Sequence, residues 1–390
     1  MPSPEGLRYN PNVVKTKPSL IRAVYALAPQ DKPQISLGLG ELSYPVPDKV
    51  KTAIKSAIIR EGTNMYTQNA GIPELRDAVA ESLNKRHGIK RDKDDVLITV
   101  GSSEALFMTA LAFADPQNRL IIPQIGYTAY EADANLVGLK TSEYRLTLNF
   151  EPDTDHLVSL LDENPGTKVV ILNSPSNPTG QTITVETLKD LTEQTEDRDD
   201  VVFVSDDIYE EFVYDGIQAR SIAEFLPDKT ITIGGLSKTA SMTGFRLGWL
   251  AGPSEIVKMV AKPHQFAVTC APSIIQHGAL PVVKGECDQD IENFRLELER
   301  KRDGMMIYLN DIPELNVLEP KGAFYCFVDV GHYGTSLEVS KRIIQETGVV
   351  TIPGRAFGEA GDKYIRISFA AKDSDIIHGI EKMKGVFERW

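Results

Sequence analysis

The side chain that most clearly indicates a reaction is that of Lys238. It is the last residue of the segment 234–238, which contains several small residues and directly follows the predicted strand 230–233. A lysine amine that is desolvated beside another cation has a lowered pKa and becomes a nucleophile able to form a Schiff base. Arg246 lies eight residues further on, in a glycine-containing segment, and could complete an anion pocket. A lysine that caps a turn is the structural alternative.

A carboxylate and a phenol follow another predicted strand, at 201–204. Asp206 at this strand end could neutralise a cation, and Tyr209, three residues on, could hydrogen-bond a phenolate. The run 205–211 contains further acidic residues, so a Mg²⁺ site is a rival interpretation. An acidic helix N-terminus is the structural alternative.

Three more segments could bind anions. Residues 101–104 (Gly-Ser-Ser-Glu) join a strand to a helix, where free N–H groups and hydroxyls bind phosphate or carboxylate, although an ordinary N-cap has the same composition. Asn177 lies in a loop at 173–180 that two prolines and a glycine restrain. Arg366 interrupts an apolar strand at 364–369, where a buried guanidinium needs a partner. That partner is either a ligand carboxylate or an internal salt bridge.

The elements around these motifs define the fold class. From residue 48, helical periods alternate with Val- and Ile-rich strands that show no polar alternation, which is typical of an α/β domain with a mostly parallel sheet. Such sheets bind ligands at the carboxyl ends of their strands. After residue 288 the pattern changes to a smaller α+β unit. The predicted helices are 50–59, 72–87, 104–113, 128–137, 185–196, 288–309, 337–347 and 374–388, and the strands are 95–100, 119–122, 168–172, 201–205, 230–233, 322–330 and 364–369.

These elements predict a division of the chain into three parts. Residues 1–18 form an N-terminal arm. Residues 48–287 form the large domain, covered by helices on its sheet. Residues 19–47 and 288–390 form the small α+β domain, which is therefore built from both chain ends.

Composition excludes several classes of function. The 390 residues carry 42 Lys+Arg and 55 Asp+Glu, a net charge of −13, so a nucleic-acid partner is not expected. Cys270, Cys287 and Cys326 form no CxxC pair, which favours a reducing compartment. The first thirty residues contain no apolar secretion segment, and the apolar stretch 96–114 is interrupted at 101–104, so we expect a cytoplasmic protein without a membrane span.

The motifs, in their order along the chain, resemble the class I/II pyridoxal-phosphate-dependent aminotransferases of fold type I. The segment from Ser237 to Gly248 is the most specific part, and Asn177-Pro-Thr-Gly180 and Asp206-x-x-Tyr209 support it. The resemblance extends from about Ile35 to the C-terminus. It implies ping-pong transfer of an amino group from an L-amino acid to a 2-oxo acid, through a Schiff base between Lys238 and pyridoxal 5′-phosphate.

The resemblance implies a role for each matching residue. Lys238 would also move the proton at the substrate Cα, Asp206 would pair with the pyridinium nitrogen, and Tyr209 and Asn177 would bind the phenolic oxygen. The other implied cofactor contacts are Ser102, Ser103 and Arg246 on the phosphate, Tyr127 stacked on the ring, and Tyr66 from the neighbouring subunit of a homodimer.

The substrate carboxylate would bind Arg366, assisted by Asn177 and the Gly40 backbone. This orientation sets the Cα–H bond perpendicular to the ring and selects transamination over decarboxylation. The resemblance implies no metal.

The chain departs from the family pattern at two positions. Gly235 stands where many members have a phosphate-site serine. Ser103 stands where bacterial members that prefer aspartate often carry lysine. We therefore expect neutral or aromatic substrate side chains rather than acidic ones.

Three other functions fit parts of the pattern. A pyridoxal-phosphate-dependent C–S β-lyase uses the same scaffold and is separated by its products, ammonia and pyruvate. A nicotinamide-dependent dehydrogenase could use the glycines at 38–43, but the third glycine is missing and the segment precedes the α/β region. A non-catalytic regulator on this scaffold usually has a basic DNA-binding module, for which this acidic chain has no room.

Overall fold

The computed structural model describes residues 7–28, 34–163 and 165–390. Parts of the predicted arm (1–6) and of the predicted small domain (29–33) lie outside the described residues. Within the described residues, no helix combines the length and apolar character needed to cross a membrane. Cys270, Cys287 and Cys326 are all free thiols.

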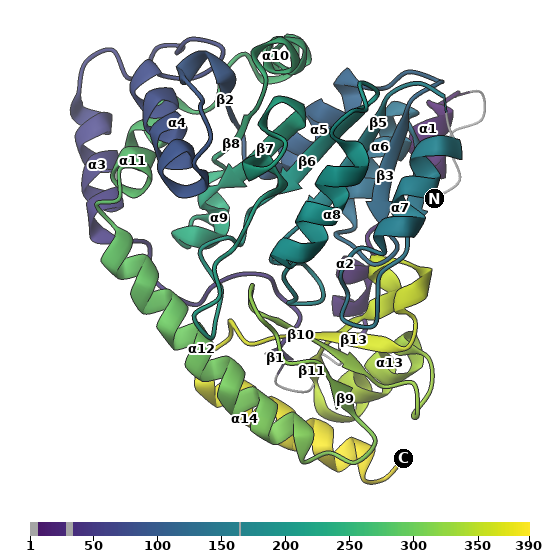
Figure 1. The fold of residues 1–390 in the computed structure, drawn as a ribbon. Coiled ribbons are helices and arrows are strands. Elements are labelled where there is room, and N and C mark those ends of the chain that lie inside the picture. The colour runs from purple at the N-terminus through teal and green to yellow at the C-terminus, as the bar shows by residue number, and fades with distance from the viewer. Residues whose placement is uncertain (1–6, 29–33, 164) are drawn as a thin grey trace.

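A seven-stranded sheet forms the centre of the larger part of the molecule (Figure 1). Its strand order is β2-β8-β7-β6-β5-β3-β4, and β8 runs antiparallel to both of its neighbours. The other neighbouring pairs are parallel, as the sequence predicted. The bounds are β2 Val96–Thr99, β3 Arg119–Pro123, β4 Lys140–Tyr144, β5 Lys168–Asn173, β6 Val201–Asp206, β7 Thr230–Gly235 and β8 Gly248–Ala251.

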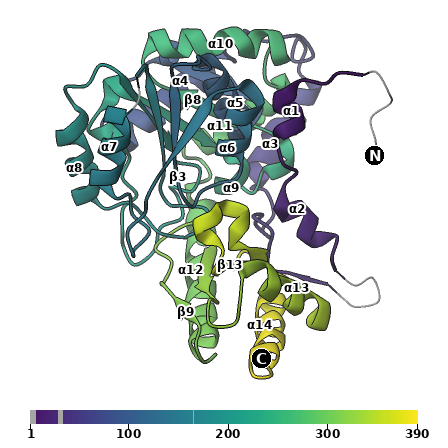
Figure 2. The same cartoon turned by 90° about the vertical axis from the view of Figure 1, so that its right-hand side faces the viewer.

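Helices cover both faces of this sheet, which explains why its strands lack polar alternation. In β5, Val169 and Ile171 pack in the core beneath α5, α6 and α10, whereas Val170 and Leu172 pack in the core beneath α7 and α8. Figure 2 shows α5 and α6 on one side of the sheet and α7 and α8 on the other. The helices of this part are α3 Asp48–Ile59, α4 Pro73–His87, α5 Ser102–Ala112, α6 Ala129–Val137, α7 Thr154–Glu163, α8 Val185–Thr195, α9 Leu236–Thr239, α10 Ser254–Val268 and α11 Ser273–Val283.

A smaller four-stranded antiparallel sheet lies beside the first, in the order β12-β13-β10-β9. The N-terminal strand β1 joins this part by pairing with β11 in parallel, and Leu37 lies in the same core as the C-terminal helices. The bounds are α1 Pro11–Lys15, α2 Leu20–Tyr25, β1 Ile35–Ser36, α12 Asp288–Asn310, β9 Asn316–Val317, β10 Tyr325–Asp329, α13 Ser336–Thr347, β11 Val349–Val350, β12 Ile352–Pro353, β13 Tyr364–Ser368 and α14 Asp373–Phe387.

Candidate active site

The carboxyl ends of β5, β6 and β7 bring the sequence motifs together. Asn173 and Asp206 are the last residues of their strands and lie opposite each other in register. β7 ends at Gly235, and the single-turn helix α9 that follows carries Lys238. The parallel strands therefore place three separate motifs at one edge of the sheet, as expected for this fold class.

Asp206 is buried, at 4% exposure, and has one unsatisfied oxygen. Its Oδ2 accepts a 2.6 Å hydrogen bond from the Tyr130 hydroxyl, whereas Oδ1 has no partner in the described part of the chain. Burial raises the pKa of Asp206 to about 6, opposed by the Tyr130 hydrogen bond. A buried carboxylate oxygen without a donor is costly unless a ligand supplies one, so Asp206 fits a cationic N–H group.

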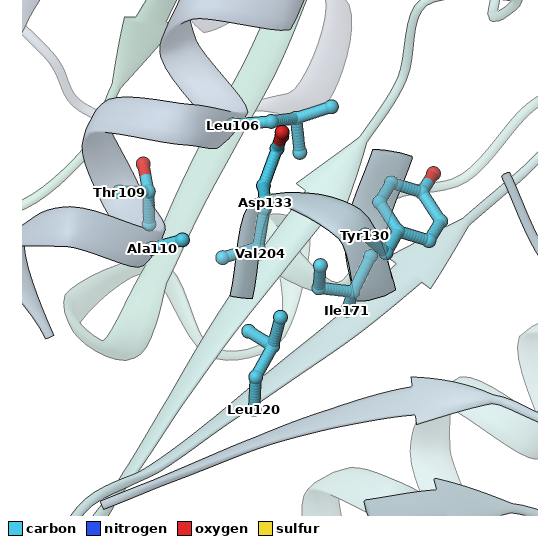
Figure 3. A pocket seen from close by; sticks show the side chains of 8 residues that line it. All are labelled: Leu106, Thr109, Ala110, Leu120, Tyr130, Asp133, Ile171 and Val204. Carbon is cyan, nitrogen blue, oxygen red and sulfur yellow. The ribbon is translucent and has the colours of Figure 1, made fainter. Parts of the chain in front are cut away.

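Tyr130 itself is held by a well-packed layer. Together with Asp133 it lines a small, mostly apolar pocket between α5, α6 and the sheet (Figure 3). Burial raises the pKa of Asp133 to about 7. Tyr130 therefore connects this pocket to Asp206. None of the motif residues at the strand ends lines the pocket.

The loop after β5 is ordered by its own amide groups. The Asn173 side chain donates to the Asp206 carbonyl at 2.7 Å and accepts from the Asn177 backbone N–H at 2.9 Å. The Ser174–Pro175 and Asn177–Pro178 peptide bonds are both cis. The Asn173 side chain thereby links the backbone of Asp206 to the backbone of Asn177.

Lys238 lies in a locally positive environment within an acidic chain. Its ammonium donates to the Gly40 carbonyl. Burial lowers the pKa of Lys238 to about 8; Glu41 opposes this change, while Arg366 and Arg246 add to it. The amine is therefore far more often neutral near pH 8 than an exposed lysine, which is what a nucleophile requires.

The residues before Lys238 are small because β8 lies against them. A Cβ atom at position 234 would come within 2.7 Å of the Trp249 indole, and one at position 235 would meet the Gly248 Cα at 3.1 Å. A serine at Gly235 would thus press on the neighbouring backbone. Glycine at this position avoids that close contact.

An anion site lies where α5 begins. Gly101 has a φ of +80°, and a Cβ there would lie 2.5 Å from the Arg246 guanidinium. Arg246 also adopts a left-handed φ of 54°, and its Nη1 donates to the Thr243 carbonyl at 2.9 Å. The guanidinium is thus held beside the free N–H groups of Ser102 and Ser103 at the helix N-terminus, an arrangement that suits a phosphate.

Arg366 is 3% exposed, and it pairs with no carboxylate among the residues that the structure describes. Its Nη1 donates to Asn177 Oδ1 at 2.7 Å and its Nη2 to the Gly38 carbonyl at 2.6 Å, while Nε has no partner. The rings of Tyr325 and Phe357 lie 4.3 and 4.8 Å from its Cζ. The internal salt bridge considered from the sequence is therefore wrong, and the charge is free for a ligand carboxylate.

Three predicted residues have contacts that the sequence did not specify. Tyr209 is buried, and its hydroxyl lies 3.0 Å from the Tyr325 hydroxyl; burial raises its pKa above the usual range. Tyr127 packs edge-to-face on Tyr130 and hydrogen-bonds Ser103. Gly40 directs its carbonyl at Lys238, and it is Gly38 that accepts from Arg366.

Tyr66 is not brought to these residues within the described chain. Its side chain is 84% exposed in the segment between α3 and α4. The glycines at 38 and 40 also do not form a dinucleotide loop, because their carbonyls face cations whereas a pyrophosphate requires N–H donors.

The sequence did not indicate the residues that contact and position the predicted site side chains. Tyr130 supports Asp206, Asn173 links Asp206 to Asn177, and Tyr325 contacts both Tyr209 and Arg366. Asn173 had a detectable signal, since it directly follows the predicted strand 168–172 and is the first residue of the 173–180 motif. Tyr130 and Tyr325 had none, because their partners lie 76 and 116 residues away.

The fold and the site together define the class of the protein. The chain matches the family "Aminotransferase class I and II" over residues 32–382. It therefore belongs to this family and is a transaminase of fold type I.

Relatives and solved structures agree with this assignment. The chain is 37% identical to a probable aspartate aminotransferase of Methanocaldococcus jannaschii, covering 95% of this chain and 98% of that protein. It is 36% identical to aromatic-amino-acid aminotransferase 2 of Thermococcus litoralis, covering 95% and 96%. A solved structure of aspartate aminotransferase from Thermus thermophilus with maleate superposes with a TM-score of 0.92, at 28% identity, covering 97% of this chain and all of that one.

Proposed function

We propose that this transaminase binds pyridoxal 5′-phosphate at the ends of β5, β6 and β7 and moves the amino group of an L-amino acid to a 2-oxo acid. One observation carries the proposal: Asp206, Lys238 and Arg366 are ionisable side chains at one site, and none of them forms an ion pair with another residue that the structure describes. Burying unpaired charges is costly, so such a set is expected where a ligand supplies the missing partners.

The donor set fits this cofactor. When bound, pyridoxal phosphate supplies an aldehyde for condensation with an amine and a protonated ring that withdraws electrons from Cα. The free oxygen of Asp206 would accept from the ring N–H and keep it protonated. Tyr209 and Asn177 would hydrogen-bond the phenolic oxygen, and Tyr127 would stack on the ring. The phosphate contacts are Ser102, Ser103 and Arg246.

Two residues act on the substrate. Arg366, held by Asn177, forms a bidentate pair with the α-carboxylate and thereby fixes the rotation about the Cα bonds. The neutral Lys238 amine then takes the proton from Cα as general base. Because Arg366 holds the carboxylate, the bond from Cα to the carboxylate carbon does not stand perpendicular to the cofactor ring. The Cα–H bond takes that orientation and is the bond that breaks.

We propose that two copies form the active sites jointly, with Tyr66 reaching the phosphate of the partner subunit. Support comes from the exposed apolar side chains that surround this residue in sequence: Ile58, Ile59 and Met65 are 63%, 83% and 65% exposed. Large exposed apolar patches mark protein interfaces. The three free cysteines support a reducing, cytoplasmic location.

The site favours neutral or aromatic substrate side chains. Lys238, Arg246 and Arg366 each have a proposed partner, so among the described residues no site cation is left for a second carboxylate. The rings of Tyr325 and Phe357 border the position of the α-carboxylate. The relatives' names include both aspartate and aromatic specificities.

A panel of amino acids with 2-oxoglutarate or pyruvate tests this preference. We expect kcat/KM for phenylalanine, tyrosine or leucine to exceed that for aspartate at least about tenfold, the size of effect a pocket contact supplies. Ser103→Lys is expected to raise aspartate turnover relative to phenylalanine, with Ser103→Thr as the matched control. A higher kcat/KM for aspartate in the unmodified enzyme contradicts the proposed preference for neutral or aromatic side chains. Release of ammonia in the absence of a 2-oxo acid acceptor identifies a lyase.

The pKa of Lys238 predicts how cofactor capture depends on pH. The neutral amine is the reacting form, so a pKa of about 8 predicts a capture rate that rises tenfold per pH unit below 8 and levels off above it. Stopped-flow absorbance of the apoenzyme mixed with pyridoxal phosphate measures this rate. Glu41→Gln removes an opposing charge and should move the midpoint to lower pH. A midpoint at the value of an exposed lysine contradicts the prediction.

A further inference from the structure

The acidic run after β6 divides into two groups. Asp206 faces the site described above, whereas Asp207 and Glu210 turn toward His87 at the end of α4. His87 Nε2 lies 3.0 Å from Glu210 Oε2, and His87 Nδ1 lies 3.2 Å from Glu224 Oε1. Both ring nitrogens of one buried imidazole thus face carboxylates.

Glu224 determines which nitrogen carries a proton. Its other oxygen accepts from Arg220 at 2.5 Å, so Glu224 is ionised and accepts from His87 Nδ1. A carboxylate that holds one imidazole nitrogen directs the lone pair of the other nitrogen outward, as in carboxylate–histidine–metal arrangements. Here that lone pair, on His87 Nε2, faces Glu210 Oε2. Because two lone pairs repel each other, the two atoms need a shared cation.

A proton is one such cation. Burial alone lowers the pKa of His87, but the hydrogen bonds to Glu210 and Glu224 outweigh it and raise the pKa to about 10. A shared proton, however, satisfies only His87 and Glu210. Asp207 is 3% exposed, its Oδ1 accepts from the Ser205 hydroxyl at 2.6 Å, and its Oδ2 has no hydrogen-bond partner among the residues that the structure describes.

A metal ion would satisfy all three side chains. His87, Asp207 and Glu210 each place one potential ligand atom within 4.8 Å of the other two. Asp207 completes a set of one imidazole and two carboxylates. Imidazole favours first-row transition ions over Mg²⁺, which prefers oxygen ligands alone.

The surrounding charges also match a divalent ion. Arg86 pairs with Glu210 and Glu211, and Arg220 pairs with Glu224. Two arginines therefore face four carboxylates, namely Asp207, Glu210, Glu211 and Glu224. This excess of carboxylates over guanidinium groups favours a bound cation.

An entry path is present. A cavity of about 520 Å³ between α4, α9 and the start of α12 is lined by Asp207, Glu210 and Glu211. Gly235 and Leu236 also line this cavity, whereas Asp206, Lys238, Arg246 and Arg366 do not. An ion can therefore reach the cluster without passing through the cofactor site.

We propose that His87, Asp207 and Glu210 bind one divalent transition-metal ion, such as Mn²⁺ or Zn²⁺, at a site distinct from the cofactor site. The ion would join α4 to the turn that follows Asp206, and so stabilise the base of the active site. The proposal does not depend on the substrate or the cofactor assigned above.

Mn²⁺ is the preferred probe because thiols bind it weakly. Cofactor-loaded protein, treated with a chelator and dialysed, is titrated with Mn²⁺ and followed by electron paramagnetic resonance. We expect one tight site per chain and a higher thermal midpoint. Asp207→Asn should weaken binding at least about tenfold, as loss of a metal contact does.

Two controls keep the test specific. Glu211→Gln removes a carboxylate from the same cavity and His378→Gln removes an exposed histidine; both should retain the site. Anomalous diffraction from wild-type crystals soaked in Mn²⁺ should give a peak between His87, Asp207 and Glu210, and it needs no variant. Absence of that peak, or Mn²⁺ binding that is equal in wild type and Asp207→Asn, overturns the proposal.

Discussion

Lys238→Ala is expected to lose transamination by at least about 10⁴-fold in kcat, since it removes both the nucleophile and the general base, and base catalysis alone contributes 10²–10⁴. The fold should remain intact, because the substitution removes a partly buried amine whose charge is disfavoured by burial and by two arginines. Steady-state kinetics with the best amino donor, together with the thermal midpoint, measure both effects.

A surface lysine provides the matched control. Lys258 lies on α10 with an exposed side chain paired to Glu255, so Lys258→Ala should keep wild-type turnover. If Lys238→Ala retained activity within tenfold of wild type while folded, Lys238 would not be the catalytic base.

Arg366→Ala should produce the second largest effect, on kcat/KM for the amino acid. Truncating one partner of a buried charge pair costs about 2–5 kcal/mol, which corresponds to roughly 30- to 4,000-fold. Arg366→Lys should recover only part of this loss, since an ammonium cannot form the bidentate pair. Half-reaction absorbance changes at varied amino acid concentration measure the loss.

Cofactor affinity separates a substrate role from structural damage. Arg366 contacts Asn177 and the Gly38 carbonyl and not the anion site at α5, so cofactor binding should change little. The control is Arg355→Ala, at an exposed arginine that pairs with Asp362 and Glu359. Equal losses for amino acids and for decarboxylated amines would show that Arg366 does not bind the carboxylate.

The sequence placed Asn177, Asp206 and Lys238 near one another because each lies at or shortly after the end of an apolar run that predicts a strand of a mostly parallel sheet. The carboxyl ends of parallel strands meet at one edge of the sheet, whereas the chemical roles of these residues stay predictions. The three strands that precede these residues are consecutive along the chain and are also neighbours in the sheet. The same logic located Arg366, since a charge inside an apolar strand requires a partner.

Other features had no local signal. β4 is an edge strand of polar residues, so it lacked the apolar run by which its neighbours were predicted. β8 contains only four residues, and its antiparallel direction depends on pairing with β2 and β7. Tyr130 reads as one more core position on a helix, and only the packed structure shows that its hydroxyl meets Asp206.

The divided acidic run shows the limit of motif reading most clearly. Asp206 and Asp207 are adjacent in sequence and lie on opposite sides of the chain, because successive residues at a strand end point in opposite directions. In the sequence, the acidic residues 206–211 could be interpreted as one site. In the structure, Asp206 contacts Tyr130 on one side, whereas Asp207 and Glu210 lie near His87 on the other.

The central claim is that the Lys238 amine is the point of covalent attachment for pyridoxal phosphate. Reduction of the loaded protein with borohydride, followed by peptide mapping by mass spectrometry, tests it directly. We predict bleaching of the yellow colour and one modified peptide, with the pyridoxyl group on Lys238 and none in Lys238→Ala. Modification of a different lysine, or a protein that takes up no cofactor, would contradict the account.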